Sequence, residues 1–212
     1  MGSKCLVIIL LSAAALFFSA GAAELLVCWG ASGDVPAVAL LESGREPLVL
    51  LPGGAEDGAE LASALLAAGQ CQLSELLMPT GAPFPRGAAR IAAGCGLRRL
   101  VVLHNARSRT PTAALYAKLT RAGTAIHTCN PEGGLWRAAL GDWQVTYEKQ
   151  KREGAFRLSF SHKIGESLPL VFYCEQRVTG VFAVGREDAP QPLLEVPKSN
   201  RAGSKRITLP AD

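Results

Sequence analysis

Short apolar runs separated by glycine- or proline-containing turns fill the first part of the chain. Such runs, when bounded by turn residues, are typical of buried strands. They predict strands at 25–29, 35–42 and 47–51, with a hairpin turn at 43–46. Residues 56–68 instead place apolar side chains at helical spacing, with acids at the start and Gly69 after the end, which predicts a helix.

The middle of the chain continues with alternating strands and helices. Strands are predicted at 73–78, 97–104 and 124–129, and helices at 87–93 and 112–122. The two prolines within 80–86 predict a loop there.

The last third is richer in strand patterns. Strands are predicted at 135–140, 143–149, 156–161, 168–175 and 178–184. Prolines and charges from Asp188 onward predict an extended C-terminal tail over 189–212. The order of elements predicts a single α/β domain over 24–188, built as a sandwich.

The N-terminal segment has the pattern of an export signal. Lys4 precedes an uncharged apolar run over 5–18, small residues follow at 19–23, and Glu24 is the first acid. This order is typical of a secretory signal peptide, with cleavage after Ala22 or Ala23. The alternative is an uncleaved membrane anchor over 1–23, since about 20 apolar residues span a bilayer. Both interpretations predict an extracytoplasmic domain: periplasmic, secreted or membrane-anchored.

The charge balance gives weak information about partners. The chain has 22 Lys and Arg against 18 Asp and Glu, for a formal charge of +4. Many of its basic residues lie late in the chain: Lys149, Lys151, Arg152, Arg157, Lys198, Arg201, Lys205 and Arg206. A solvated surface and a loose tail explain them, and contact with phosphates of nucleic acid or lipid is the alternative.

The cysteines lie too far apart for a zinc motif. There are six, with no CxxC pair, and removal of a signal peptide would leave five. One or two disulfides are compatible with export, although their pairing does not follow from the spacing. Cys28, Cys129 and Cys174 lie in apolar runs and equally fit small buried side chains.

No complete catalytic or cofactor motif is present. The glycine turns at 30–34 and 52–54 lack the remainder of a phosphate-binding loop. His104, His127 and His162 are far apart, without the close pair usual in zinc sites. The acids Asp34, Asp57 and Asp142 fall in predicted turns, where solvated carboxylates are expected. The sequence therefore assigns no catalytic, cofactor-binding or metal residue, and no cofactor.

The order of elements resembles the C-terminal metallo-β-lactamase-like domain of the ComEC family of bacterial DNA-uptake proteins. The segment 28–35 (CWGASGDV) stands where that family has D-V-G-Q-G-D-A, and 48–54 (LVLLPGG) where it has a strand ending in I-D-T-G. The segment 76–87 occupies the place of the metal motif T-H-x-H-x-D-H followed by Gly, and keeps only Thr80 and Gly87. Weaker similarities occur at 123–129, 141–145 and 167–173.

The resemblance implies a fold without the chemistry of its family. It implies a four-layer α/β/β/α sandwich over about 25–188, in which the metal-ligand positions hold residues that cannot ligate. Such a chain would be a pseudoenzyme that acts by binding, with DNA or a membrane partner as candidates.

Two further hypotheses remain open at the level of sequence. One is an exported binding or structural domain of unrelated ancestry, with a different strand order. The other is an extracytoplasmic metal-dependent hydrolase assembled from His104, His127 and Asp34, which predicts that these three side chains converge in one cleft. The partner and the oligomeric state do not follow from the sequence.

Overall fold

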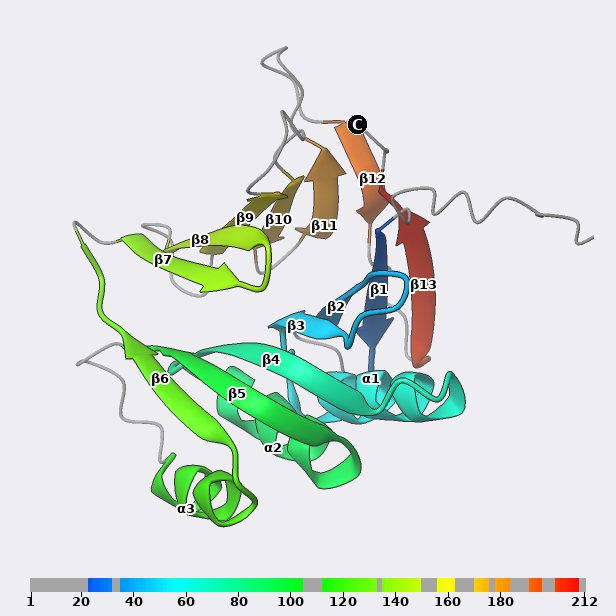
Figure 1. Ribbon diagram of the computed structural model, residues 1–212. Coiled ribbons are helices and arrows are strands. Elements are labelled where there is room, and N and C mark those ends of the chain that lie inside the picture. Colours follow the sequence, from blue (N-terminus) through cyan, green and yellow to red (C-terminus); the bar gives the residue numbers. More distant parts are fainter. Residues whose placement is uncertain are drawn as a thin grey trace, which may run out of the picture.

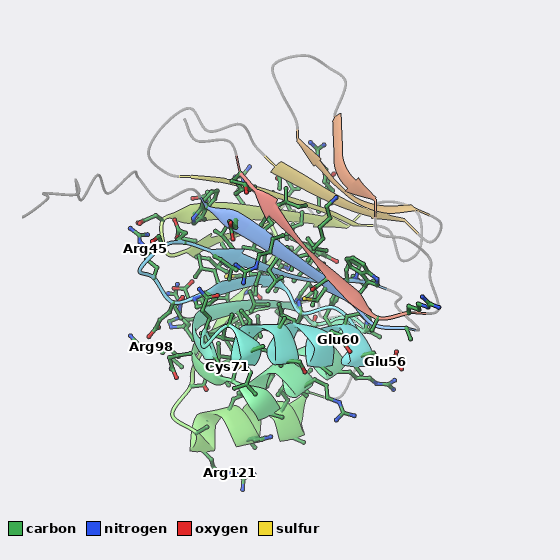
Figure 2. The ribbon with its side chains drawn as sticks, turned by 90° about the vertical axis from the view of Figure 1, so that its right-hand side faces the viewer. Arg45, Glu56, Glu60, Cys71, Arg98 and Arg121 are labelled. Atoms are coloured by element: carbon green, nitrogen blue, oxygen red, sulfur yellow. A yellow bond between two sulfur atoms is a disulfide. The ribbon has the colours of Figure 1, made fainter. Side chains whose placement is uncertain are left out.

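A computed structural model describes residues 23–31, 35–104, 112–132, 135–149, 156–162, 170–175, 178–183, 191–195 and 201–209. These residues form one mixed sheet (sheet A), one antiparallel sheet (sheet B) and three helices. The helices cover one face of sheet A, and sheet B lies on its other face, so that the elements form successive layers (Figures 1 and 2).

Sheet A joins both ends of the described chain. Its spatial order is β13 (Gly203–Thr208), β1 (Glu24–Trp29), β2 (Ala37–Leu41), β3 (Leu48–Leu51), β4 (Gln72–Pro79), β5 (Gly96–Leu103) and β6 (Ala125–Cys129). The pairs from β13 to β3 are antiparallel, and those from β3 to β6 are parallel.

Each parallel pair of strands is connected through a helix. These helices are α1 (Ala55–Ala67), α2 (Phe84–Gly94) and α3 (Ala113–Arg121). Connections between neighbouring parallel strands are almost always right-handed, so three successive ones place their helices on the same face. Figure 1 shows all three helices on that face.

Sheet B is an antiparallel sheet in which strand neighbours follow chain order. It contains β7 (Leu135–Leu140), β8 (Trp143–Lys149), β9 (Phe156–His162), β10 (Leu170–Glu175), β11 (Val178–Ala183) and β12 (Gln191–Glu195). Because side chains alternate along a strand, one face of β7 and β8 buries Trp136, Ala138, Leu140, Trp143, Val145 and Tyr147. These residues join the same apolar core as the strands of sheet A.

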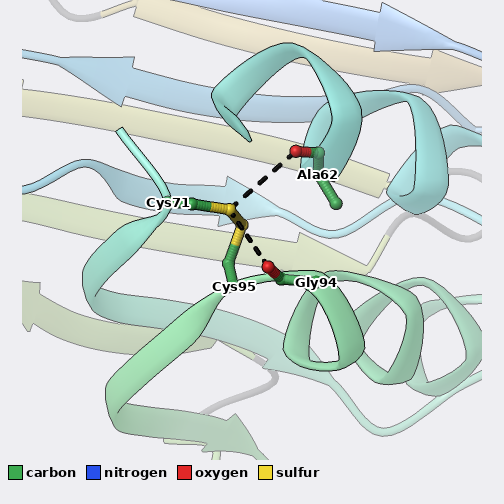
Figure 3. The surroundings of a disulfide bond; sticks show 4 residues. All are labelled: Ala62, Cys71, Gly94 and Cys95. Carbon is green, nitrogen blue, oxygen red and sulfur yellow. Dashed lines mark hydrogen bonds between the residues drawn. A yellow bond between two sulfur atoms is a disulfide. The ribbon is translucent and has the colours of Figure 1, made fainter. Parts of the chain in front are cut away.

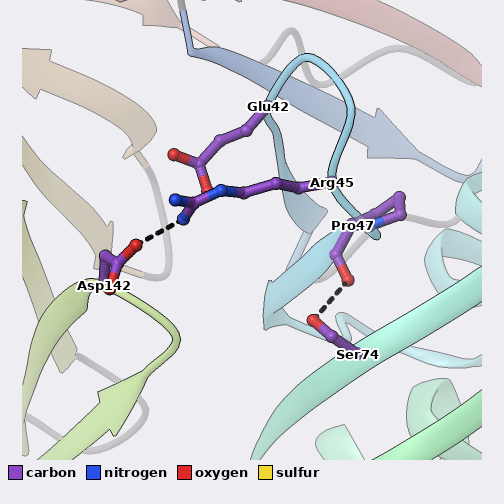
Figure 4. A network of polar contacts seen from close by, with 5 residues as sticks. All are labelled: Glu42, Arg45, Pro47, Ser74 and Asp142. Carbon is purple, nitrogen blue, oxygen red and sulfur yellow. Dashed lines mark hydrogen bonds and ion pairs between the residues drawn. The ribbon is translucent and has the colours of Figure 1, made fainter. Parts of the chain in front are cut away.

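One ion pair and one hydrogen bond connect the two sheets beside this core. Arg45, in the turn between β2 and β3, donates to Asp142 in the turn between β7 and β8 at 2.5 Å (Figure 4). Arg99 of β5 pairs with Glu75 of β4, and it also donates to the carbonyl oxygen of Ala139 on β7 at 3.2 Å. The β2–β3 turn and β5 therefore each make a polar contact with sheet B, in addition to the shared apolar core.

The structure confirms the α/β class and most of the predicted elements, and it shows three layers in the described residues. On β7, β8 and the described part of β9, the outer face of sheet B carries mainly polar side chains, including Arg137, Gln144, Thr146, Glu148, Arg157 and Ser159. None of the described helices covers this face. A polar face offers little apolar area for a helix to bury, so these strands provide no basis for packing a fourth layer.

Two segments differ from their predicted structure. The predicted loop at 80–86 is wrong in its last part, because α2 begins at Phe84 and Pro85 occupies its first turn, where proline is tolerated.

The predicted tail at 189–212 contains β12 and β13. Strand β13 pairs with β1 along six residues, from Gly203 opposite Trp29 to Thr208 opposite Glu24. Exposed Lys205 and Arg206 precede buried Ile207, and charged side chains of this kind are typical of an edge strand. The predicted signal or anchor falls outside the described residues, except for Ala23.

Candidate functional site at the carboxyl edge of sheet A

The carboxyl ends of several strands meet at one edge of sheet A. Both β1 and β3 run antiparallel to β2, so they share a direction with β4 and β5. The residues that follow these strands are Gly30, Pro52–Gly54, Thr80 and His104. Ligands of open α/β sheets commonly bind outside such carboxyl ends, so this edge is the candidate ligand-binding site of the fold.

A buried carboxylate, that of Asp57, connects two of these loops. One oxygen of Asp57 accepts the backbone N–H of Gly30 at 2.8 Å, and the other accepts that of Gly54 at 3.0 Å. Asp57 is the third residue of α1 and is only 2% exposed. The expectation of a solvated turn carboxylate is therefore wrong for Asp57, which caps the helix and fixes the loops after β1 and β3.

Close contact between glycines places α2 against the loop after β3. A Cβ atom on Gly58 of α1 would lie 2.5 Å from the carbonyl oxygen of Gly87 on α2. A Cβ atom on Gly87 would overlap the carbonyl oxygens of Pro52 and Gly53. Only a residue without a side chain permits this approach of backbone to backbone.

Polar contacts also join the ends of β4, β5 and β7. The hydroxyl of Thr80 donates to the carbonyl oxygen of Leu103 at 3.2 Å, and Thr80 is 6% exposed. The indole of Trp136 on β7 donates to the carbonyl oxygen of His104 at 2.9 Å. Trp136 also packs edge-on against Tyr147, with ring centroids 5.6 Å apart. These side chains support the backbone at this edge.

The structure separates His104 from His127. In the parallel pairing of β5 and β6, Val101 lies beside His127 and Leu103 beside Cys129. Alternation therefore places His127 on the side of Leu103, whereas His104 directly follows Leu103 and belongs to the other side. Both histidines are exposed.

The remaining acid of the hypothetical metal site and the side chain of the third histidine of the chain are not described by the structure. Asp34 and the side chain of His162 lie outside the described residues. Within the described part of the chain, no group of three or more His, Cys, Asp or Glu side chains is arranged to hold a metal ion.

One pair of cysteines forms a disulfide far from the carboxyl edge. Cys71 precedes β4 and Cys95 follows α2, so their bond ties the starts of β4 and β5 (Figure 3). The Cys71 sulfur lies 3.2 Å from the carbonyl oxygen of Gly94. An oxidised sulfur carries no proton, so this contact is a hydrogen bond only when the thiols are reduced.

Cys28 is a buried thiol in the core of sheet A. Burial, followed by the negative charges of Glu60 and Asp57, raises the pKa of Cys28 from 9.0 to about 12. A thiol in this state is a poor nucleophile, because the thiolate is the reactive form. The prediction that Cys28 is a small buried side chain is confirmed.

Sequence reasoning missed Asp57 as the organising residue of this edge. A signal was present, because Asp57 stands three residues after Gly54, at the position where an acidic side chain completes a helix cap. The edge contains backbone groups, glycines and prolines, together with Thr80, His104 and the acidic residues Glu56 and Asp57; both carboxylate oxygens of Asp57 accept backbone hydrogen bonds. It is built to fix loops.

Comparisons with known proteins give no assignment. No model of a known protein family matches the chain, and a search of curated proteins gives no match. Among the described residues, no helix has both the length and the apolar character needed to cross a membrane.

Proposed function

We propose that this chain is an exported or membrane-anchored domain, related to the metallo-β-lactamase-like domain of the ComEC family, that binds a partner without catalysing a reaction. In this proposal the fold is a metallo-β-lactamase-like sandwich with an uncovered outer sheet. The metal motif has been lost, and the carboxyl edge of sheet A serves as a structural element.

The main support is the convergence of the three segments that carry the resemblance. Residues 28–31 of the first segment and 48–54 of the second are connected through Asp57, which accepts the N–H groups of Gly30 and Gly54. The segment 76–87 reaches the same place, because Gly87 lies against the backbone of Pro52 and Gly53. Segments separated along the chain thus meet at one edge of sheet A, as the proposal expects of the segments that carry the resemblance.

The residue types at this meeting point favour binding over hydrolysis. Between Thr80 and Gly87 the chain reads Gly-Ala-Pro-Phe-Pro-Arg, which contains no imidazole, thiol or carboxylate. Metal-assisted hydrolysis requires a first shell of such side chains to hold the ion and activate water.

Two observations support an extracytoplasmic location. The N-terminal segment has the order of charges and apolar residues found in export signals. The disulfide between Cys71 and Cys95 belongs to an oxidising compartment, because cytosolic thiols are normally kept reduced. Intact mass after fractionation of expressing cells tests this part: the proposal expects the chain in an extracytoplasmic or membrane fraction, and recovery in the cytosol alone contradicts it.

Metal content tests the central claim. The full chain is purified, loaded with zinc and then manganese, desalted, and measured by elemental analysis. We expect far less than one ion per chain. About one tightly held ion per chain contradicts the proposal, and the double variant His104→Ala/His127→Ala then shows whether these histidines are its ligands.

A further inference from the structure

Acidic residues are missing from a long central stretch of the chain. Between Glu75 and Glu132 the sequence contains no Asp or Glu. The same residues, 76–131, contain eight basic side chains: Arg86, Arg90, Arg98, Arg99, Arg107, Arg109, Lys118 and Arg121. A run of 56 residues with this bias stands out in a chain whose overall charge is only +4.

Four of these basic residues form what we call the basic helical face. Arg98 and Arg99 pair with Glu46 and Glu75, and Arg107 and Arg109 lie outside the described residues. The other four are exposed on two helices: Arg86 and Arg90 on α2, and Lys118 and Arg121 on α3. None of the four forms an ion pair within the described part of the chain.

The geometry gathers these charges on the helical layer. Arg86 and Arg90 are four residues apart, and Lys118 and Arg121 three apart, so each pair shares one face of its helix. The two helices contact each other and cover the same side of sheet A. Figure 2 shows Arg121 pointing away from the body of the molecule.

Helix α1, beside α2, has the opposite charge. It contains Glu56, Asp57 and Glu60 and no basic residue. Figure 2 shows Glu56 and Glu60 on α1, well apart from Arg121. The helical layer therefore carries negative charge on one helix and positive charge on the other two, which a merely solvated surface of mixed charges does not require.

The composition of the face favours a nucleic acid over a membrane. Helices that bind lipid surfaces insert an exposed apolar face. The large apolar side chains of α2, Phe84 and Ile91, are buried in the core. Within the described residues the exposed large apolar side chain is Leu66, which lies on α1. The face therefore offers positive charge to a partner and no exposed large apolar side chain. Electrostatic contacts with phosphates supply essentially all of the non-specific binding of nucleic acids.

We propose that the basic helical face binds the phosphate backbone of nucleic acid without sequence preference. The inference rests on the proposed function only in treating the domain as a binding module. It places the contact on α2 and α3, apart from the basic residues near the C-terminus; Arg86, in the first turn of α2, lies beside the carboxyl edge of sheet A.

Salt-dependent binding of a labelled duplex to the full chain tests the proposal. Fluorescence anisotropy with a random-sequence DNA duplex is measured at several salt concentrations in the presence of EDTA. The variants are Arg86→Gln/Arg90→Gln and Lys118→Gln/Arg121→Gln. The matched control, Arg137→Gln/Arg157→Gln, removes two exposed charges from the outer face of sheet B. Circular dichroism and thermal unfolding verify that each variant is folded.

We expect the native chain to bind, with an affinity that falls roughly 100-fold between 50 and 200 mM salt if about four phosphates are contacted. Each helix variant lowers the slope of log affinity against log salt by about 2, whereas the control leaves it unchanged. The proposal is overturned if the control weakens binding as much as the helix variants. It is also overturned if the chain binds anionic phosphatidylglycerol vesicles instead of the duplex, or neither. Because EDTA is present, none of these outcomes depends on a bound metal ion. The metal analysis tests the proposed function separately, so either proposal can fail without the other.

Discussion

Gly58 on α1 and Gly87 on α2 lie in direct backbone contact. A Cβ atom on Gly58 would be 2.5 Å from the carbonyl oxygen and 2.8 Å from the Cα atom of Gly87. The neighbouring atoms are main chain, so they cannot rotate out of the way as a flexible side chain would. This contact sets how closely the two helices pack, and it also holds the start of α2 against the loop after β3.

Replacement of Gly58 by alanine is expected to destabilise the protein. In a free helix the change would add up to about 1 kcal/mol of stability. Here the methyl group forces the two helices apart, and overpacking of this kind costs about 1–3 kcal/mol. Urea unfolding followed by circular dichroism measures the net loss. Gly94→Ala is the control, because its Cβ would make only a 3.4 Å contact with Ala62. If Gly58→Ala and Gly94→Ala behave alike, the helices are not in the contact described.

Removal of the Asp57 carboxylate is expected to cost stability as well. Asp57→Ala leaves the buried N–H groups of Gly30 and Gly54 without their acceptor. Loss of hydrogen bonds to a charged group should lower the free energy of unfolding by about 2–3 kcal/mol. The control Glu60→Ala, one turn later and partly exposed, should change it by about 0.5 kcal/mol or less. A small effect at Asp57 would mean that another group supports these loops.

The disulfide between Cys71 and Cys95 is expected to stabilise the fold measurably. It closes a loop with a sequence separation of 24, for which the loss of chain entropy in the unfolded state predicts about 3 kcal/mol. Dithiothreitol should therefore lower the thermal midpoint of the native chain and leave the double variant Cys71→Ser/Cys95→Ser unaffected. Peptide mapping without reduction should recover the two cysteines in one cross-linked fragment. Recovery of both as free thiols contradicts the pairing.

The pairing of β13 with β1 gives a test at the end of the chain. Ile207 points into the core, whereas Lys205 is exposed. Ile207→Asp places a charge in an apolar site and should greatly destabilise the protein, because unpaired buried charges are very costly. Lys205→Asp, on the same strand, should be tolerated. If both variants retain native stability in urea, β13 is not part of the sheet.

Local patterns in the sequence predicted the elements, and distant contacts limited what else could be predicted. Runs such as 25–29 and 47–51 are short, apolar and bounded by turns, so their strand character is evident. The segment 203–208 has no such run, and it becomes a strand by pairing with β1; Arg206 and Glu24 in this pair are 182 positions apart. Nothing local encodes that contact.

The same limit applies to the candidate site. The position of Asp57 near the start of a helix was evident, but its contacts with Gly30 and Gly54 depend on how the loops after β1 and β3 come together. The partner of Cys71 likewise depended on the fold, since β4 and β5 are neighbours only in the assembled sheet. The convergence of the loops on Asp57 therefore appeared only in three dimensions.

The raised pKa of Cys28 predicts a specific dependence of stability on pH. In the unfolded chain this thiol ionises near its usual pKa of 9.0, whereas in the folded protein the pKa is about 12 because of burial and the charges of Glu60 and Asp57. Below pH 9 the thiol is neutral in both states, and its contribution is fully retained. Above pH 9 only the unfolded state releases the proton, so stability falls by up to about 1.4 kcal/mol per pH unit until about pH 12.

The free energy of unfolding, measured in urea at pH 8.0 to 10.5, should therefore decline more steeply for the native chain than for Cys28→Ala. The control Val27→Ala removes packing at the neighbouring core position without removing a titratable group, so it should lower stability equally at every pH and keep the native slope. Parallel pH profiles for the native chain and Cys28→Ala would show that the thiol ionises alike in both states, and that it is not buried beside these carboxylates.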